Sequence, residues 1–264
     1  MNLEITFVIV THNHAKYIDQ CLVSCVQSLR IVHGEIIVVD NCSTDGTMQI
    51  LNKYSDSISL IPNTVRIGFS ANNNKAIKQA QGRYVFILNP DTSFSPNIVR
   101  GLIDLANTVP NLGLIAPHLI YPDGSIQPSC RRFPTIGSFL VRRTPLRLLL
   151  KDTMLNRKHL MFDKFKQGEI KVDWVLGACM LIPKVVFDKI GLFDERFYLY
   201  VEDIDLCYRM YQAGLDVVYT SKYKIVHHHL AESDWKLFGI RSWYHFHSMI
   251  QFVLKYKLNY NYFG

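Results

Sequence analysis

The chain has 264 residues, of which 48% are hydrophobic and 19% are charged, and this composition is typical of a folded globular protein rather than a disordered one. Its formal net charge of +7 favours anionic partners such as nucleotides or phospholipid headgroups. We expect no nucleic-acid partner. The sequence shows no secretory signal and no apolar run of about 20 residues, so we expect no membrane-spanning segment.

The cysteines indicate a reducing compartment. Cys21 and Cys25 share one face of a predicted helix with apolar residues, and no C-x-x-C pair occurs, so we interpret them as packed thiols. We therefore expect a cytoplasmic protein, with any membrane contact made peripherally at the inner face of the cytoplasmic membrane.

The first half of the chain alternates between apolar strands and amphipathic helices. Continuous Ile and Val runs predict strands that are covered on both faces, which is typical of a parallel sheet. The predicted strands are 5–10, 35–40, 58–61 and 84–88, and the predicted helices are 15–29, 46–54 and 70–81. The pattern predicts an α/β fold.

The second half is less regular. Residues 131–171 are rich in Arg, Lys and Leu without a clear period, so we interpret them as an excursion over the sheet. The remaining predicted strands are 114–117, 173–182, 216–219 and 224–227, and the predicted helices are 184–190, 202–213 and 235–256. The aromatic and basic composition of the last helix suits an interfacial membrane anchor, or equally a helix packed on its own domain or in a homodimer.

Polar residues follow three of the predicted strands. Thr11 and Asn13 follow the first, Asp40 and Asn41 end the second, and Asn89 begins an Asn-Pro-Asp sequence after the fourth. Ligands of open α/β sheets bind beyond the carboxyl ends of the strands, so we expect one site to collect these side chains.

A diphosphate ligand at this site would need a cation. The sequence contains neither a G-x-G-x-x-G turn after a strand nor a P-loop, so no such backbone nest is predicted for phosphate. A divalent ion with oxygen ligands is the usual alternative, and Asp91 is the candidate ligand. Spacing alone also allows Asp91 to be an ordinary turn residue.

Several motifs together resemble one enzyme family. They are FVIVTHN, IIVVDNCSTDGT, LNPDT, GACMLIPKVVFDKIGLFDERFYLYVEDIDLCYRMYQAG and VHHH, in this order over about residues 3–230. This set resembles the second family of nucleotide-sugar-dependent glycosyltransferases, and within it the rhamnosyltransferase-like branch. The resemblance implies the A-type glycosyltransferase fold, with a Rossmann-like, mostly parallel central sheet flanked by helices and a C-terminal helical tail.

The resemblance also implies roles on the donor side. Asp40 would contact the base or ribose, Thr11 and Asn13 would line the same pocket, and Asp91 would bind Mg²⁺ or Mn²⁺ on the diphosphate. On sequence grounds alone, Asp40 also fits a residue that caps the turn that follows it. We further expect Asn41 and Asn74 to contact the donor, although Asn74 also fits a cap or a solvated helix face.

The metal motif departs from the family's Asp-x-Asp pattern. Its first position is Asn89, which keeps an oxygen but carries no charge, so we expect metal and donor to bind together. The resemblance assigns a contact with the metal or the diphosphate to His227, the first of three adjacent histidines.

Glu202, Asp203 and Asp205 begin a predicted helix. Acidic residues are stabilising at this position in any helix. The resemblance assigns the base that deprotonates the acceptor hydroxyl to Asp203. We expect the helix terminus to lower the pKa of Asp203, and Glu202 or Asp205 to offset this effect. On the acceptor side we expect Trp174, Gly177 and Asp205, although Trp174 fits a core position equally well.

The sequence therefore predicts an inverting glycosyltransferase. It would move a sugar, rhamnose being one candidate, from a dTDP, UDP or GDP sugar to a hydroxyl of a saccharide or lipid-linked acceptor in surface polysaccharide synthesis. We expect one domain over residues 1–230, with a donor half (1–117) and an acceptor half (118–230), followed by a tail over 231–264. The alternative is a non-catalytic sugar-binding or nucleotide-binding homologue that serves as a subunit of a larger synthase.

Overall fold

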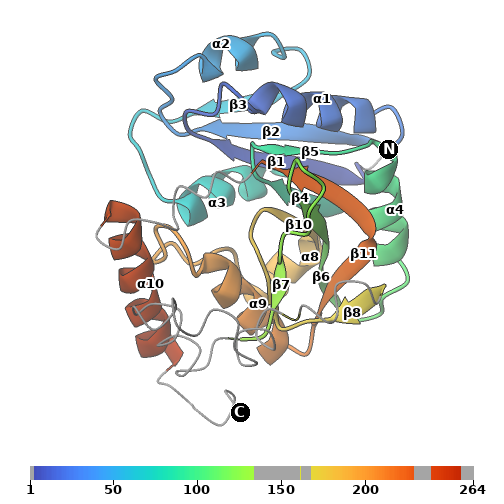
Figure 1. Cartoon of the computed structure of the whole chain (residues 1–264), viewed down its shortest axis with the longest axis vertical. Coiled ribbons are helices and arrows are strands. Elements are labelled where there is room, and N and C mark those ends of the chain that lie inside the picture. Colours follow the sequence, from blue (N-terminus) through green and yellow to red (C-terminus); the bar gives the residue numbers. More distant parts are fainter. Residues whose placement is uncertain (1–2, 134–160, 162–167, 229–238, 257–264) are drawn as a thin grey trace.

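The computed structural model describes residues 3–133, 161, 168–228 and 239–256. They form a mixed sheet with the order β3-β2-β1-β4-β10-β6-β11-β5, and β8 pairs with β11 beside this path (Figure 1). Strands β1, β2, β3, β4, β6 and β11 run in one direction, and β5, β8 and β10 run in the other. The α/β class and the mostly parallel sheet are confirmed.

The strands of this sheet are β1 (Ile5–Thr11), β2 (Gly34–Asp40), β3 (Ser59–Pro62), β4 (Tyr84–Leu88), β5 (Thr92–Ser93), β6 (Leu112–Ile120), β8 (Glu169–Lys171), β10 (Cys179–Pro183) and β11 (Asp216–His227). A separate pair contains β7 (Cys130–Arg131) and β9 (Trp174–Val175). The helices are α1 (Ile18–Ser28), α2 (Thr47–Asn52), α3 (Phe69–Gln79), α4 (Asn97–Ala106), α8 (Lys184–Ile190), α9 (Glu202–Gln212) and α10 (Ile240–Tyr256).

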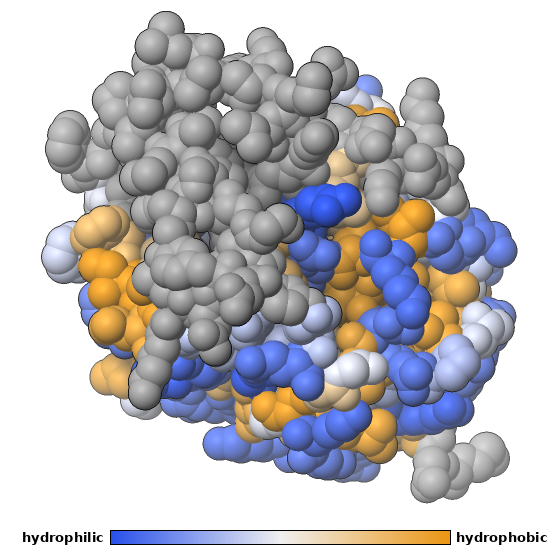
Figure 2. Space-filling view, turned by 90° about the horizontal axis from the view of Figure 1, so that it is seen from below, coloured by the Kyte–Doolittle hydropathy of each residue, from blue (hydrophilic) through white to orange (hydrophobic). Residues whose placement is uncertain are grey.

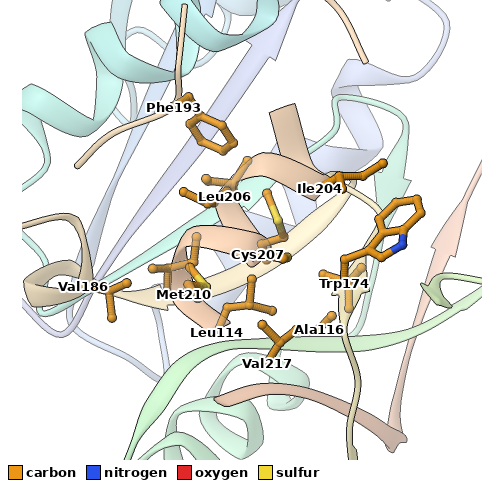
Figure 3. Packing of buried hydrophobic residues seen from close by; sticks show 14 of the residues in the cluster. Leu114, Ala116, Trp174, Val186, Phe193, Ile204, Leu206, Cys207, Met210 and Val217 are labelled. Carbon is orange, nitrogen blue, oxygen red and sulfur yellow. The ribbon is translucent and has the colours of Figure 1, made fainter. Parts of the chain in front are cut away.

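The helices cover both faces of the sheet. One core contains side chains of α1 and α4 packed on alternate residues of β1, β2 and β4. The other core contains α3, α8, α9 and α10 on the opposite face, and Figure 3 shows α9 contributing Leu206, Cys207 and Met210 against Leu114 and Val217. Burial on both faces explains the continuous Ile and Val runs of the central strands.

Strand register brings the three polar strand ends together. Thr11 of β1 pairs with Asp40 of β2, and Ile9 pairs with Leu88 of β4, so all three strands end at the same edge. Asn89 follows immediately. The predicted convergence of these residues at one edge is confirmed.

Two strand predictions were wrong. Residues 173–182 are not one strand, because β9 pairs with β7 whereas β10 pairs with β4, and the chain changes partner at residues 176–178. The predicted strands 216–219 and 224–227 form one strand, β11, whose register to β6 shifts between Thr220 and Lys224. Most of the predicted excursion 131–171 lies outside the described residues.

Helix α10 packs against α9 through Met249 and Phe252 and leaves an apolar stripe on its outer side. The exposed members of this stripe are Trp243, Phe246, Ile250 and Leu254. Figure 2 shows apolar side chains at the left edge, the side on which α10 lies in Figure 1. None of the described helices has the length and apolar character needed to cross a bilayer.

Candidate active site

Asp40 is buried at the end of β2, with 3% of its surface exposed. Its Oδ2 atom accepts a hydrogen bond from Ser43 N at 3.0 Å, so the carboxylate does cap the following turn. Its Oδ1 atom is buried and has no hydrogen-bond partner in the described part of the chain. An unpaired buried acceptor is costly, and the N–H of a nucleobase or a ribose hydroxyl would satisfy it.

Thr11 and Asn13 shape the loop beside Asp40. Thr11 is fully buried, and its Oγ1 lies 3.3 Å from His14 Nδ1. Asn13 adopts a left-handed backbone conformation with φ 58°, which Asn tolerates better than most residues. Its side-chain Oδ1 accepts a hydrogen bond from Thr44 N at 2.7 Å. Asn13 thereby fixes the start of the loop that leads to α2.

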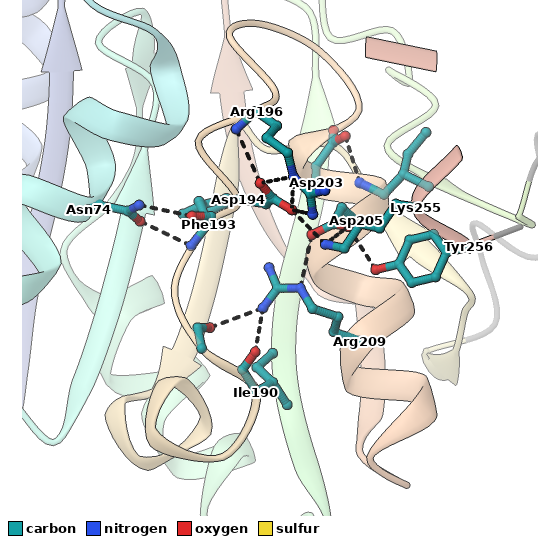
Figure 4. A network of polar contacts seen from close by, with 12 residues as sticks. Asn74, Ile190, Phe193, Asp194, Arg196, Asp203, Asp205, Arg209, Lys255 and Tyr256 are labelled. Atoms are coloured by element: carbon teal, nitrogen blue, oxygen red, sulfur yellow. Dashed lines mark hydrogen bonds and ion pairs between the residues drawn. The ribbon is translucent and has the colours of Figure 1, made fainter. Parts of the chain in front are cut away.

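Asn41 and Asn74, which we expected to contact the donor, instead hold backbone segments of the protein in place. Asn41 Nδ2 donates to Ile67 O at 2.9 Å and its Oδ1 accepts from Ile67 N at 3.0 Å, so this side chain holds the 63–68 loop. Asn74 is buried and makes the same two-sided contact with Phe193, at 2.9 and 3.0 Å (Figure 4). The prediction that Asn74 contacts the donor is therefore wrong, because a backbone segment occupies both polar ends of its amide.

Asp91 and His227 form the candidate metal centre. His227 Nε2 lies 3.3 Å from Asp91 Oδ1 and 3.3 Å from Asn89 Nδ2, and His227 Nδ1 lies 2.8 Å from Gln127 Oε1. Burial raises the pKa of Asp91, but the hydrogen bond and charge of His227, together with the charge of His14, hold it below its ordinary value. The carboxylate is thus ionised and partly exposed.

The side-chain atoms of Asp91 and His227 are suitable ligands for a divalent cation. The 3.3 Å between Asp91 Oδ1 and His227 Nε2 is close to the separation of two neighbouring ligands when each metal bond is about 2.1 Å. Gln127 faces the other imidazole nitrogen, as partners of metal-binding histidines commonly do. Among the described residues no group of three His, Cys, Asp or Glu side chains is placed to hold an ion. Phosphate oxygens of a donor would therefore have to complete the coordination.

Asp203 is partly exposed at the start of α9. Its Oδ2 accepts a hydrogen bond from Gly177 N at 3.1 Å, and its Oδ1 accepts one from Ile204 N at 2.8 Å. Burial nevertheless raises the pKa of Asp203, with these N–H groups and the charge of Arg131 only partly opposing it. The helix terminus does lower this pKa through Ile204 N, but burial outweighs it, so the expectation of a low pKa was wrong. A raised pKa suits a base that must accept a proton.

Glu202 is more deeply buried than the adjacent Asp203. It is 6% exposed, and its Oε2 is buried without a hydrogen-bond partner in the described chain. Burial and the adjacent Asp203 carboxylate raise the pKa of Glu202 well above its ordinary value. Tyr200 and Val201, just before it, have φ of 69° and 73°, and a β-branched residue in this conformation is strained. The strained turn places the Glu-Asp pair at the helix start.

Asp205 does not contact the site. It is fully buried, and its oxygens bind Arg209 Nε at 2.9 Å, Lys255 Nζ at 2.5 Å and Tyr256 OH at 2.8 Å (Figure 4). The expectation that Asp205 contacts the acceptor is therefore wrong. The helical pattern of α9 turns this position inward, toward α10.

Trp174 lies in β9, and Gly177 lies in the break between β9 and β10. Trp174 is 5% exposed, its indole N–H donates to Arg132 O at 2.8 Å, and the Arg131 guanidinium lies 5.2 Å from its ring centre. This environment favours the core alternative over stacking on a sugar. Gly177, by contrast, contacts the candidate base through its backbone N–H.

The break between β9 and β10 joins the two halves of the site. Asn89 N, beside the metal pair, donates to Ala178 O at 2.8 Å, and the preceding residue Gly177 donates to Asp203. One peptide segment therefore contacts both the metal loop and the candidate base. Sequence reasoning missed Gln127, which lies in no motif, and Arg131 as a neighbour of Asp203.

The comparisons with known proteins agree with this architecture. The sequence profile described as Glycosyl transferase family 2 matches residues 6–190. An N-acetylglucosaminyl-diphospho-decaprenol L-rhamnosyltransferase of Mycobacterium tuberculosis is 29% identical over 84% of this chain and 75% of its own. Rhamnosyltransferase WbbL of Escherichia coli K12 is 27% identical over 84% of this chain and 82% of its own.

Solved structures share the A-type fold. GalNAc-T7 with UDP, GalNAc and Mn²⁺ superposes with a TM-score of 0.65 at 17% identity, over 86% of this chain and 43% of that one. The mannosyltransferase PcManGT of Pyrobaculum calidifontis, with GDP-Man and Mn²⁺, gives 0.60 at 16% identity, over 89% and 59%. The chain thus spans less than two thirds of these structures. With the profile matched over residues 6–190, the chain belongs to glycosyl transferase family 2.

Proposed function

We propose that this protein is an inverting glycosyltransferase that transfers a sugar, rhamnose being the first candidate, from a nucleotide-diphosphate sugar to a hydroxyl group. The observation that supports it most is the shared segment at residues 177–178, which contacts the loop of Asp91 on one side and Asp203 on the other. A donor held at Asp91 would bring its anomeric carbon near a base at Asp203.

The transfer is a single displacement. Asp203 accepts the proton of the acceptor hydroxyl while that oxygen forms a bond to the anomeric carbon, and the bond from this carbon to the diphosphate oxygen breaks. The electron pair of the broken bond leaves with the nucleoside diphosphate. Burial and the Asp203 carboxylate raise the pKa of Glu202, which disfavours a second negative charge beside the base.

Asp40 would recognise the nucleoside through its unpaired Oδ1. Asp91 and His227 would hold Mg²⁺ or Mn²⁺, which supplies positive charge to the diphosphate. Residues 1–117 would then form the donor half and residues 118–230 the acceptor half. The names of the relatives from M. tuberculosis and E. coli support rhamnose as the sugar, and the first supports a lipid-linked saccharide as the acceptor.

A donor-turnover assay tests this proposal. We would measure release of nucleoside diphosphate from dTDP-rhamnose, UDP sugars and GDP sugars with Mn²⁺ or Mg²⁺, with and without a lipid-linked saccharide. Asp203→Asn should lower kcat by at least about 100-fold while donor affinity is kept, since general-base catalysis contributes roughly this much. Asp56→Asn is the matched control, because Asp56 is exposed in the turn after α2.

Three results would contradict it. Full activity of Asp203→Asn would remove the assigned base. Donor binding by calorimetry without turnover for any acceptor would favour the non-catalytic homologue, for which the uncharged Asn89 in the metal loop is the supporting feature. Retention of the anomeric configuration in the product would exclude single displacement.

A further inference from the structure

Helix α10 presents a continuous apolar stripe to the outside of the protein. Its members Trp243, Phe246, Ile250 and Leu254 are 61%, 52%, 41% and 64% exposed. Their spacing of three, four and four residues puts them on one helical face. Figure 1 shows α10 at the edge of the molecule, with α9 on its inner side. Large apolar side chains gathered on an outer face are typical of a surface that binds a partner.

The inner face of α10 is fixed to the rest of the protein. Ser248 Oγ donates to Leu199 O at 3.1 Å. The Tyr244 ring stacks on the Tyr198 ring, with 4.7 Å between their centres. Near the other end of the helix, Lys255 pairs with a buried carboxylate of α9. These contacts hold the helix in one orientation, so the stripe faces outward as a fixed surface.

The positive charge of the chain is concentrated in one stretch of sequence. Residues 131–171 contain 11 Lys and Arg against 3 Asp and Glu, a net charge of +8, whereas the whole chain has 29 against 22, a net charge of +7. The remaining residues therefore carry a net charge of only −1. The negative surface potential of a bilayer that contains anionic lipids attracts such a concentration of Lys and Arg.

The basic stretch starts next to the contact between α9 and α10. The ring of Phe133 lies 5.4 Å from that of Tyr208 in α9, and the ring of Tyr208 lies 6.0 Å from that of Phe252 in α10. Met161 is buried in the same core cluster. Between Phe133 and Met161 the sequence holds 6 basic residues and 1 acidic residue. The apolar stripe and the most basic part of the chain are thus joined to one core.

We infer that the outer face of α10 docks on an anionic phospholipid bilayer. The four apolar side chains would enter the boundary between headgroups and acyl chains, as those of interfacial amphipathic helices do. A second copy of the chain fits this face less well, because a symmetric contact would bring two strongly positive stretches together. Four partly exposed side chains also offer only on the order of 400 Å², about half of what one partner contributes to a standard interface.

Docking would bring the candidate base close to the lipid surface. Leu199 and Tyr198, which α10 contacts, lie just before Glu202 and Asp203 at the start of α9. A saccharide acceptor carried on a membrane lipid would then meet the base near the bilayer. This consequence rests on the proposed function, whereas the docking itself does not.

Vesicle binding by the full chain tests the inference. Flotation measures the affinity for vesicles of equal parts phosphatidylglycerol and phosphatidylcholine, and for vesicles of phosphatidylcholine alone. The wild type should bind the anionic vesicles, and it should bind the neutral ones at least about tenfold more weakly. A double variant, Phe246→Gln with Leu254→Gln, should bind the anionic vesicles at least about tenfold more weakly than the wild type, because it removes apolar area from the contact.

The matched control changes two exposed apolar residues outside α10. Val65, in the 63–68 loop, is 66% exposed, and Val185, in α8, is 69% exposed. The variant Val65→Gln with Val185→Gln should bind the anionic vesicles as the wild type does. Release of nucleoside diphosphate in solution, without lipid, should be unchanged in both double variants, and this assay tests the proposed function separately.

Four results would overturn the inference. A wild type that binds neither kind of vesicle, or binds both equally, excludes an anionic bilayer. Equal binding by the wild type and the α10 double variant shows that the stripe makes no contact with lipid. A wild-type dimer in light scattering that the α10 double variant loses assigns the face to a second copy. A melting temperature lowered in the α10 double variant but not in the control assigns it to another segment of the same chain.

Discussion

Lys255 of α10 neutralises Asp205 of α9 inside the protein. Its Nζ lies 2.5 Å from Asp205 Oδ1 and 2.8 Å from Asp194 Oδ2 (Figure 4). The same atom lies 5.7 Å from the ring centre of Phe197 and 5.2 Å from that of Tyr256. Asp205 is two residues from the candidate base, so the last described helix stabilises the first turn of the helix that begins with Glu202.

Lys255→Met should destabilise the protein by about 3 kcal/mol, because it leaves a buried carboxylate with fewer partners. The matched control is Lys171→Met, since Lys171 makes a 2.8 Å ion pair with Asp216 but is 72% exposed. That variant should lose at most about 1 kcal/mol. Urea unfolding measures both, and equal losses in the two variants would contradict this account of α10.

Arg131→Met should shift the acid limb of the pH–rate profile to higher pH. Asp203 acts as a base only when ionised; burial raises its pKa and the positive charge of Arg131 partly lowers it again. Removing that charge raises the pKa further, so a higher pH is needed to ionise the same fraction of enzyme. The profile of kcat against pH gives the shift directly.

Arg131→Lys should restore most of the original profile, and Arg132→Met, at the exposed neighbouring position, should leave it unchanged. An unchanged acid limb in Arg131→Met would show that another group governs the titration.

Gln127→Leu should weaken metal binding about tenfold, since a partner of a metal-binding histidine fixes its orientation. The substitution removes the 2.8 Å contact with His227 Nδ1 but leaves Asp91 and the ring in place. Mn²⁺ titration followed by electron paramagnetic resonance, in the presence of nucleoside diphosphate, measures the effect. Gln81→Leu, at an exposed position, is the control. Unaltered Mn²⁺ affinity would argue against His227 as a ligand.

Gly68→Ala should destabilise the protein by about 1–3 kcal/mol. A Cβ atom at Gly68 would lie 2.7 Å from Tyr198 O and 2.9 Å from Tyr198 Cα, and backbone atoms cannot move aside cheaply. Gly46 precedes α2 as Gly68 precedes α3, yet its Cβ would meet only Ala15 Cβ at 3.5 Å. Thermal unfolding should therefore show a clear loss for Gly68→Ala and a much smaller one for Gly46→Ala.

The local hydrophobic pattern of the sequence was sufficient to predict the central strands and helices. The strand 84–88 and the helix 184–190 have the predicted bounds, since continuous apolar runs and flanking turn residues define them. The polar strand ends met at one edge because parallel strands in register must end together. These are consequences of short stretches of sequence and of sheet geometry.

Contacts between distant segments were beyond the reach of sequence pattern. Asn74 and Phe193 are separated by 119 residues, and nothing near Asn74 indicates that a backbone segment will occupy its amide. The break in 173–182 depends on which strands pair with each half, β7 or β4, and an apolar run does not specify its partner. The sequence around Asp205 likewise does not indicate that this carboxylate is buried against Lys255 and Tyr256 of α10.

Because α10 packs on α9, the part of the chain that folds together extends beyond the part that the family profile matches. The family profile ends at residue 190, before either helix, and the motifs end near residue 230. A recombinant fragment trimmed at either point would lack the lysine that compensates an interior acid. A fragment that retains the buried acid should therefore keep residues up to 256, beyond the part of the chain that the family profile matches.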